Sequence, residues 1–245
     1  MRTRLDLEMT RRGLAKSREG AQRLIMAGRV RVNSRPASKA DLRVDAETAI
    51  AIVGATSEYA SRGGYKLAAA IDHFQVDIAG RRVLDVGAST GGFTDVLLRR
   101  GAASVIALDV GYGQLAEKLR RDARVITIDR TNIRNVTSAD LPYPPDLVTI
   151  DTSFISLRLV LPAVMAIAAP NADIIALVKP QFEVGKGKVG KGGIVRDAAM
   201  RKDALDSILA FARAAGLEIA GSVESPITGA EGNIEYLALF RKRSA

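Results

Sequence analysis

Short apolar runs alternate with helix-like segments through most of the 245-residue chain. Each run has the length of a buried strand, and most are followed by apolar residues that recur every three or four positions. The runs lie at Val83–Val86, Ser104–Leu108, Val125–Ile128, Leu147–Ile150 and Ile174–Val178. Because strands that alternate with helices form parallel sheets, this pattern predicts a doubly wound, Rossmann-like α/β domain.

The last two apolar runs break the alternation. Leu217–Val223 and Ile234–Phe240 are separated by too few residues for a helix of the preceding kind, so they should pair antiparallel. A parallel sheet that closes with an antiparallel edge hairpin is typical of class I methyltransferase domains.

The front of the chain has a different pattern, which predicts a small α+β module. Apolar positions indicate two short helices, the second capped by Ser17 and followed by Gly28. Val30 to Val32 and Ala49–Val53 then read as strands. We therefore place a first domain at residues 1–54, a polar, glycine-containing linker at 55–64 and a second domain at 65–245.

Charge and composition narrow the possible functions. The net charge of +9 is concentrated before Arg43 and suggests a polyanionic partner, either nucleic acid or an anionic membrane surface. The chain has no Cys and one His, which argues against disulfides, a metal site and a cysteine nucleophile. No apolar run is long enough to span a bilayer and the first residues are charged, so we expect a cytoplasmic protein without stable membrane association.

If the partner is RNA, the basic front module should contact it. The best candidates for phosphate contacts are Arg12, Lys16, Arg18 and Arg29, and their binding should weaken with salt. Aromatic residues are scarce here, which favours recognition of folded RNA by shape and backbone. The alternative is an ordinary solvated charged face.

A glycine-containing loop follows the first strand and opens a helix, where doubly wound sheets bind nucleotides. Its spacing is Asp-x-Gly-x-x-x-Gly, the pattern seen where S-adenosylmethionine binds, and not the Gly-x-Gly-x-x-Gly of dinucleotide folds. The carboxylate of the cofactor could meet the helix N-terminus, while Asp85 holds its ammonium group or orders the loop. A purely structural turn is the alternative. The loop residues assigned to the cofactor are Asp85, Gly87, Ser89, Thr90, Gly91, Gly92 and Phe93.

Two acids at the ends of the next strands complete this candidate site. Asp109 ends the second strand, where an acid binds the ribose hydroxyls of the cofactor in related sheets. Asp129 ends the third strand and is the candidate for the adenine amino group, although it could simply cap the next segment.

The residues available for methyl transfer favour a hydroxyl acceptor. Carbon-5 methylation of pyrimidines usually needs a Cys, and methylation of base amines usually shows Pro-Pro after the acid at Asp151, where this chain has Thr152 and Ser153. Asp151 and Lys179 end adjacent strands and should share one cleft. Lys66 and Glu235 can join them only through tertiary folding. Each of the four alone would more often form a surface ion pair.

Long matches then identify a resemblance over essentially the whole chain to the TlyA proteins, ribosomal RNA 2'-O-methyltransferases related to the FtsJ/RrmJ enzymes. The matching segments are Leu14–Arg18, Ala27–Val30, Ser61–Leu67, Asp85–Thr94, Asp109–Leu115, Ser153–Leu157, Val178–Glu183 and Gly232–Tyr236.

The resemblance implies an S4-type RNA-binding domain at the front and S-adenosylmethionine as cofactor. It matches Lys66, Asp151, Lys179 and Glu235 to the catalytic Lys-Asp-Lys-Glu tetrad, in which Lys179 is our candidate to deprotonate or polarise the 2'-hydroxyl. The implied substrate is ribosomal RNA or a ribosomal subunit, with cytidine as the methylated nucleotide.

Two other functions remain open on the sequence. Relatives of this family carry the name haemolysin, so one alternative is a membrane-active protein, which a liposome-leakage assay would test. The other alternative is a non-catalytic RNA-binding ribosome-assembly factor that keeps the fold without the chemistry. An assay of methyl transfer to unmodified ribosomes would separate such a factor from an active methyltransferase. The oligomeric state and the modified position are also open.

Overall fold

The structure is a computed structural model, and it describes residues 2–15, 17–26, 28–37, 39–52, 58–185, 187, 189–190, 192–229 and 232–243. The chain folds into two compact units, Met1–Glu58 and Tyr59–Ala245. Each unit is described by itself.

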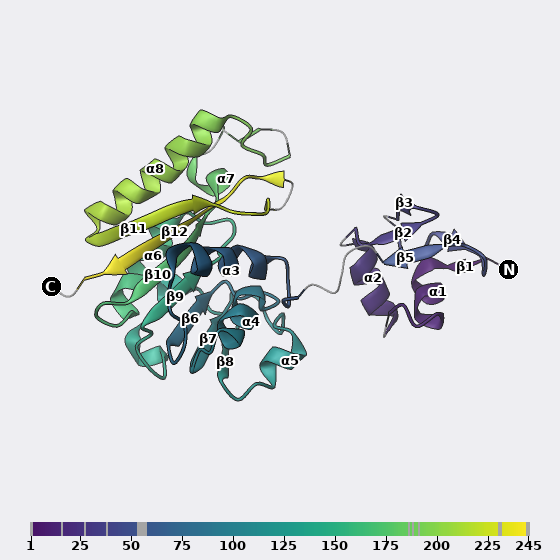
Figure 1. The fold of residues 1–245 in the computed structure, drawn as a ribbon, viewed down its shortest axis with the longest axis horizontal. Coiled ribbons are helices and arrows are strands. Elements are labelled where there is room, and N and C mark those ends of the chain that lie inside the picture. Colours follow the sequence, from purple (N-terminus) through teal and green to yellow (C-terminus); the bar gives the residue numbers. More distant parts are fainter. Residues whose placement is uncertain are drawn as a thin grey trace. The chain divides into compact units, whose positions relative to one another are not determined.

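The first unit is a small α+β module (Figure 1). Its elements are β1 (Thr3–Arg4), α1 (Leu5–Arg11), α2 (Arg18–Met26), β2 (Val30–Val32), β3 (Arg35–Pro36), β4 (Arg43–Val44) and β5 (Ile50–Ile52). Strand β2 lies between β3 and β5 in an antiparallel sheet, and β1 pairs with β4. The helices pack on a core built around Leu5, Met9, Ile25 and Val30.

Local signals explain the boundaries in this unit. The predicted cap of α2 is present, because the Ser17 hydroxyl accepts a hydrogen bond from the Gly20 N–H at 3.1 Å. The turn after β2 is tight. Asn33 and Ser34 have φ values of 49° and 66°, so the chain reverses on two residues and Arg35–Pro36 already pairs with β2.

The second unit contains the predicted strand and helix alternation (Figure 1). Its elements are α3 (Gly63–Phe74), β6 (Arg82–Val86), α4 (Gly92–Arg99), β7 (Ser104–Leu108), α5 (Glu117–Arg120), β8 (Val125–Ile128), η1 (Ile133–Asn135), η2 (Ser138–Asp140), β9 (Leu147–Ile150), α6 (Leu157–Ile167), β10 (Asp173–Val178), α7 (Pro180–Glu183), α8 (Ala198–Ala214), β11 (Leu217–Glu224) and β12 (Tyr236–Lys242). The strand order is β11-β12-β10-β9-β6-β7-β8. Strands β6 to β10 run parallel, and β12 is antiparallel to both neighbours, which confirms the predicted fold class.

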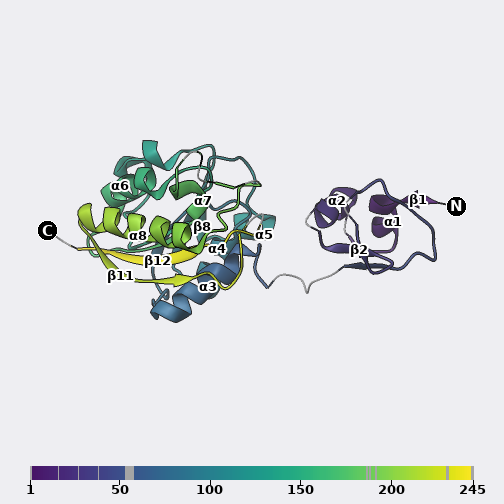
Figure 2. The ribbon, with the colours of Figure 1, turned by 90° about the horizontal axis from the view of Figure 1, so that it is seen from above.

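Helices cover both faces of this sheet, as Figure 2 shows from above. Helices α6 and α8 pack on one face, over alternate strand residues such as Leu84 and Val148. Helices α3, α4 and α5 pack on the other, over residues such as Val83 and Leu147. Because both faces are buried, the open side of the domain is the edge at which the parallel strands end.

The segment 59–64, which the sequence pattern assigned to a linker, packs on the second unit instead. The Ala60 N–H donates to the Asp95 carboxylate at 2.7 Å. At Gly64, an added Cβ would lie 2.5 Å from Tyr59, so this position has no room for a side chain. The predicted linker is therefore too long at this end. Residues 53–57, which contain the predicted boundary at Gly54, lie outside the described residues.

Candidate functional site: two adjoining clefts at the carboxyl edge of the sheet

The loop between β6 and α4 takes a conformation that requires glycine. Gly87 and Gly91 have φ values of 84° and 94°. An added Cβ at Gly87 would lie 2.5 Å from the backbone oxygen of Asp151. Two successive N–H groups, those of Gly87 and Ala88, donate to the Leu108 carbonyl at 2.8 and 3.1 Å. The glycines thus let the β6 loop lie directly against the loop after β9.

Asp85, which precedes this loop, belongs to β6 and is fully buried. Its carboxylate accepts hydrogen bonds from the hydroxyls of Thr94 at 2.7 Å and Thr149 at 2.9 Å. Burial raises the pKa of this carboxyl to about 6, while the two hydroxyls act in the opposite direction. Since none of its surface is exposed, Asp85 orders the loop and is not placed to hold the ammonium group of a cofactor.

The larger of two clefts lies beside this loop and has a volume of about 690 Å³. Gly87, Ser89 and Asp109, three of the residues assigned to the cofactor from the sequence, line it. The Asp109 carboxylate accepts the N–H groups of Ser89 at 2.8 Å and Gly111 at 2.7 Å, one on each oxygen. Each oxygen keeps a second lone pair, so Asp109 can still accept hydrogen bonds from a ribose diol.

The structure places three other predicted cofactor residues differently. Thr90, Gly91 and Asp129 lie outside the lining of both clefts. The Asp129 carboxylate accepts the Gly113 N–H at 3.0 Å and so closes the turn after β7. Gly113 precedes Asp129 in the chain, so this contact is not the cap of the next segment that the sequence left open as the alternative.

Sequence reasoning missed the far wall of the larger cleft. This wall includes Asn132, Ile133 and Arg134, which are the N-cap and the first two residues of η1. Asn132 caps η1 through its side chain, which accepts the Arg134 N–H at 3.1 Å. An Asn two residues before an Arg carries no distinctive sequence pattern, and only the position of the segment at the sheet edge reveals it.

The smaller cleft, of about 390 Å³, brings together Lys66, Asp151, Lys179 and Glu235. The Lys66 Nζ lies 2.5 Å from Glu235 Oε2, and the Lys179 Nζ lies 2.6 Å from Asp151 Oδ1. Both lysines are 8% exposed and Glu235 is 2% exposed. One buried and one partly buried ion pair therefore line one cleft, where the ammonium groups can bind a hydroxyl oxygen and a carboxylate can accept its proton.

The two clefts adjoin, because they share part of their lining. The shared residues are Gly87, Ser89, Asp151, Ser153 and Phe154. The predicted loop residues Gly92 and Phe93 line the smaller cleft as well. Ligands bound in the two clefts would thus lie next to each other, beside the loop that carries Asp151.

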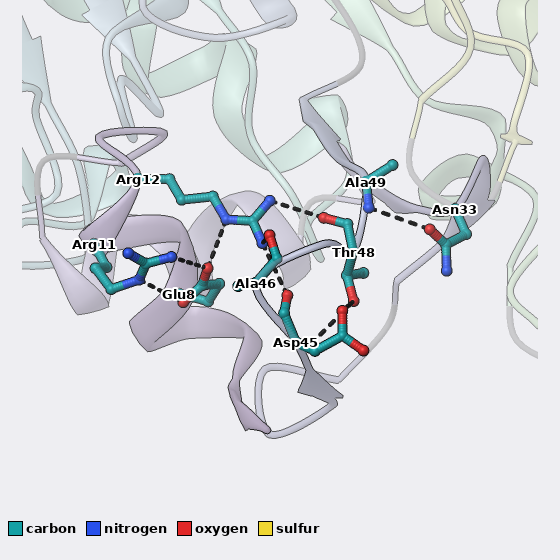
Figure 3. A network of polar contacts seen from close by, with 8 residues as sticks. All are labelled: Glu8, Arg11, Arg12, Asn33, Asp45, Ala46, Thr48 and Ala49. Atoms are coloured by element: carbon teal, nitrogen blue, oxygen red, sulfur yellow. Dashed lines mark hydrogen bonds and ion pairs between the residues drawn. The ribbon is translucent and has the colours of Figure 1, made fainter. Parts of the chain in front are cut away.

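In the first unit, Arg12 has a structural task (Figure 3). Its guanidinium donates to Glu8 at 2.6 Å and to the carbonyls of Thr48, Asp45 and Ala46 at 2.8 to 2.9 Å. Hydrogen bonds from Arg11 and Arg12 lower the pKa of Glu8 to about 2. Because most of its N–H groups bind within the unit, Arg12 is not available for phosphates, contrary to the prediction from charge alone.

The other predicted RNA contacts differ in their surroundings. Arg18 pairs with the buried Asp6 at 3.0 Å but leaves 53% of its side chain exposed. Arg29 lies directly before β2, and its backbone N–H bonds Leu24 at the end of α2. Lys16 lies outside the described residues.

In the part of the chain that the structure describes, no group of three or more His, Asp or Glu side chains could hold a metal ion. Nor is any described helix long and apolar enough to cross a membrane.

The fold and the two clefts define the class of this protein. A doubly wound sheet with an antiparallel edge hairpin and a glycine loop at its carboxyl edge is the α/β methyltransferase fold. Family comparisons agree, since the model of the FtsJ-like methyltransferases matches residues 59–242 and that of the S4 domain matches residues 3–50. The chain therefore belongs to the FtsJ-like methyltransferase family, as a TlyA-type enzyme that carries an S4 domain.

Three similar proteins illustrate the relationship. The 16S/23S rRNA (cytidine-2'-O)-methyltransferase TlyA of Mycobacterium tuberculosis is 49% identical over 99% of this chain and 91% of its own length. Hemolysin A of Brachyspira hyodysenteriae is 40% identical over 97% of this chain and 99% of its own. A solved structure of a candidate hemolysin from Streptococcus thermophilus has 40% identity and a TM-score of 0.79, covering 100% of this chain and 90% of that one.

Proposed function

We propose that this enzyme transfers a methyl group from S-adenosylmethionine to the 2'-hydroxyl of a cytidine ribose in ribosomal RNA. The observation that carries the proposal is the convergence of Lys66, Asp151, Lys179 and Glu235, from four distant segments, in one cleft that adjoins the glycine loop. Relatives named as rRNA (cytidine-2'-O)-methyltransferases support the acceptor and the nucleotide.

The larger cleft fits the proposed cofactor. Gly87 and Ser89 present backbone at its floor, and Asp109 offers carboxylate oxygens for the ribose hydroxyls. The bound cofactor would supply an electrophilic methyl group on a positively charged sulfur. The exposed backbone of the glycine loop, before the first turn of α4, suits the negative end of its amino-acid part.

The smaller cleft holds the acceptor in this proposal. Methyl transfer is an in-line displacement, so the protein chiefly aligns the hydroxyl and assists removal of its proton. Lys179 lines the smaller cleft and is held by Asp151, which lines both clefts. As an ammonium group it donates a hydrogen bond to the 2'-oxygen; to take the hydroxyl proton it must first pass a proton of its own to Asp151. The Lys66–Glu235 pair lines the same cleft, and the ammonium group of Lys66 places a positive charge near the oxygen that loses the proton.

The S4 unit supplies RNA affinity in this scheme. Arg18, Arg29 and Lys16 are the proposed phosphate contacts. Arg12 is not one of them, because its guanidinium is occupied by hydrogen bonds within the unit. Binding through phosphates should weaken steeply as the salt concentration rises.

A transfer assay with the Lys179→Ala variant tests the proposal. Tritiated methyl groups should pass from S-adenosylmethionine to unmodified ribosomal subunits with the wild-type chain, and Lys179→Ala should lower the rate by about 10² to 10⁴. Cofactor affinity, measured by calorimetry, should be unchanged. The matched control is Lys202→Ala, because Lys202 is an exposed lysine of α8 that pairs only with its neighbour Asp206 within the described contacts.

Two outcomes would contradict the proposal. Near-normal turnover by Lys179→Ala would remove Lys179 from the chemistry. Mapping of the product by mass spectrometry should find methylated ribose, and methyl groups found only on bases would refute the hydroxyl acceptor.

The name of the Brachyspira relative makes membrane lysis a second function to test. Vesicles of anionic lipid loaded with a fluorescent dye should keep their content when the protein is added. Leakage at low protein concentration, unchanged in Lys179→Ala, would establish lysis as a separate activity.

A further inference from the structure

Ser153 contacts the head group of Lys179 in the smaller cleft. The Lys179 Nζ donates to Ser153 Oγ at 3.0 Å while it pairs with Asp151 Oδ1 at 2.6 Å. The ring centroid of Phe182 lies 5.9 Å from the same nitrogen. The ammonium group is therefore bounded on three sides, by a carboxylate, a hydroxyl and an aromatic ring.

These contacts limit the direction in which the third N–H group of the Lys179 ammonium can point. A lysine ammonium has three N–H groups in tetrahedral directions, and two are used by Asp151 and Ser153. Since all three side chains line the smaller cleft, the third direction is the one left for a ligand there. A lysine side chain has four flexible methylene groups, so a single carboxylate partner would let its head group pivot.

The loop that carries Ser153 is held independently of this contact. At its start, the Asp151 N–H donates to the Val86 carbonyl at 2.9 Å. At its end, Glu183 accepts the Ser156 hydroxyl at 2.5 Å and the Leu157 N–H at 2.9 Å. Glu183 lies four residues after Lys179, so these bonds also tie the two segments together.

We infer that Ser153 is a positioning residue for methyl transfer, which aims Lys179 at the acceptor hydroxyl. The inference rests on the proposed function for its kinetic part only, because the contact with Lys179 exists without substrate. Ser153 is exposed in the structure, and the hydroxyl proton that it does not use for Lys179 stays free to meet the substrate.

The test compares two variants of the full-length chain with the same shape. Threonine keeps the hydroxyl, whereas valine replaces it with a methyl group. Ser153 is not among the residues with positive φ, so both β-branched side chains fit the backbone. In ribosomal subunit methylation, Ser153→Val should lower kcat about tenfold to a hundredfold, as expected for loss of a hydrogen bond to a charged group. KM for the subunit and cofactor affinity should stay near wild-type values, and Ser153→Thr should restore most of kcat.

A second measurement is independent of activity. Acetic anhydride labels lysine amines, and peptide mass spectrometry gives the labelling rate of each lysine. Lys179 should react several-fold faster in Ser153→Val than in Ser153→Thr, because one of its two acceptors is lost, while Lys66 should react equally in both. Melting curves from circular dichroism should show that both variants are folded.

The outcomes separate the inference from the proposed function. Equal kcat in the two variants, or equal labelling of Lys179, would overturn the positioning role. A parallel fall of kcat in both would assign the effect to bulk in the loop and would also overturn it. Absence of methyl transfer by the wild-type chain would refute the proposed function, and the labelling rates would then still decide whether Ser153 holds Lys179.

Discussion

Replacing Asp85 with Asn should change how the stability of the larger unit depends on pH. Burial raises the pKa of Asp85 from 3.8 to about 6, so the native carboxyl holds a proton at pH values where the unfolded chain has lost it. Because the native state then binds more protons, the contribution of Asp85 to the free energy of unfolding falls as the pH rises from about 4 to about 6.

The pKa gives the size of the effect. A rise in pKa of this extent changes the contribution of Asp85 to the free energy of unfolding by about 3 kcal/mol in total. About 2 kcal/mol of this change occurs between pH 4.5 and 7.5. Asparagine is uncharged throughout, and it can accept from one threonine and donate to the other. Relative to the wild type, the free energy of unfolding of Asp85→Asn should therefore rise by about 2 kcal/mol across this range. For a unit of this size that is roughly 4–8 °C in Tm.

Differential scanning calorimetry of both chains at a series of pH values measures this difference. The matched control is Asp122→Asn. Hydrogen bonds from Arg124 lower the pKa of Asp122 to about 2, so its contribution is lost only as the pH falls below about 4. This variant should keep a constant offset from the wild type between pH 4.5 and 7.5. If Asp85→Asn also runs parallel to the wild type, the carboxyl of Asp85 is not linked to folding in this way.

Three further changes test other parts of the molecule. Arg12→Met should destabilise the first unit by roughly 2 kcal/mol, because it removes the bonds to Glu8 and to three carbonyls, and circular dichroism melting would show it. An unchanged melting curve would contradict this role. Gly87→Ala should lower methyl transfer at least about tenfold, since its Cβ would press on the Asp151 backbone, and a fully active variant would speak against the close packing of these loops. Glu235→Gln should lower kcat about a hundredfold while leaving cofactor affinity unchanged, because Lys66 loses its charged partner; altered cofactor affinity alone would place Glu235 elsewhere in the mechanism.

The architecture could be read from the sequence because its signals are local. Apolar runs and helical periodicity placed β6 to β10 within one residue of their ends, and the short connection between β11 and β12 predicted their antiparallel pairing. The glycine loop was recognisable for the same reason. Its residues are adjacent in the chain, and its conformation depends on their own backbone freedom.

The contacts of individual polar side chains could not be predicted from the sequence, because they depend on which groups the fold brings near each side chain. Charge alone made Arg12 a phosphate contact, yet the turn at Asp45–Thr48 supplies carbonyls that occupy it. Asp85 offered two roles, and its burial between Thr94 and Thr149 left one. Asp129 likewise closes a turn and does not line the cleft.

The four residues of the smaller cleft show the division most clearly. The sequence by itself determined that Asp151 and Lys179 end adjacent parallel strands, and therefore that they lie near one another. Lys66 and Glu235 are 169 residues apart, on α3 and just before β12, and only the tertiary structure decided that they pair. Ser153 lies in a segment that matches the family, but the sequence assigned it no role. Its contact with Lys179 exists because two loops at one sheet edge are tied together, and such long-range contacts leave no periodic trace in the chain.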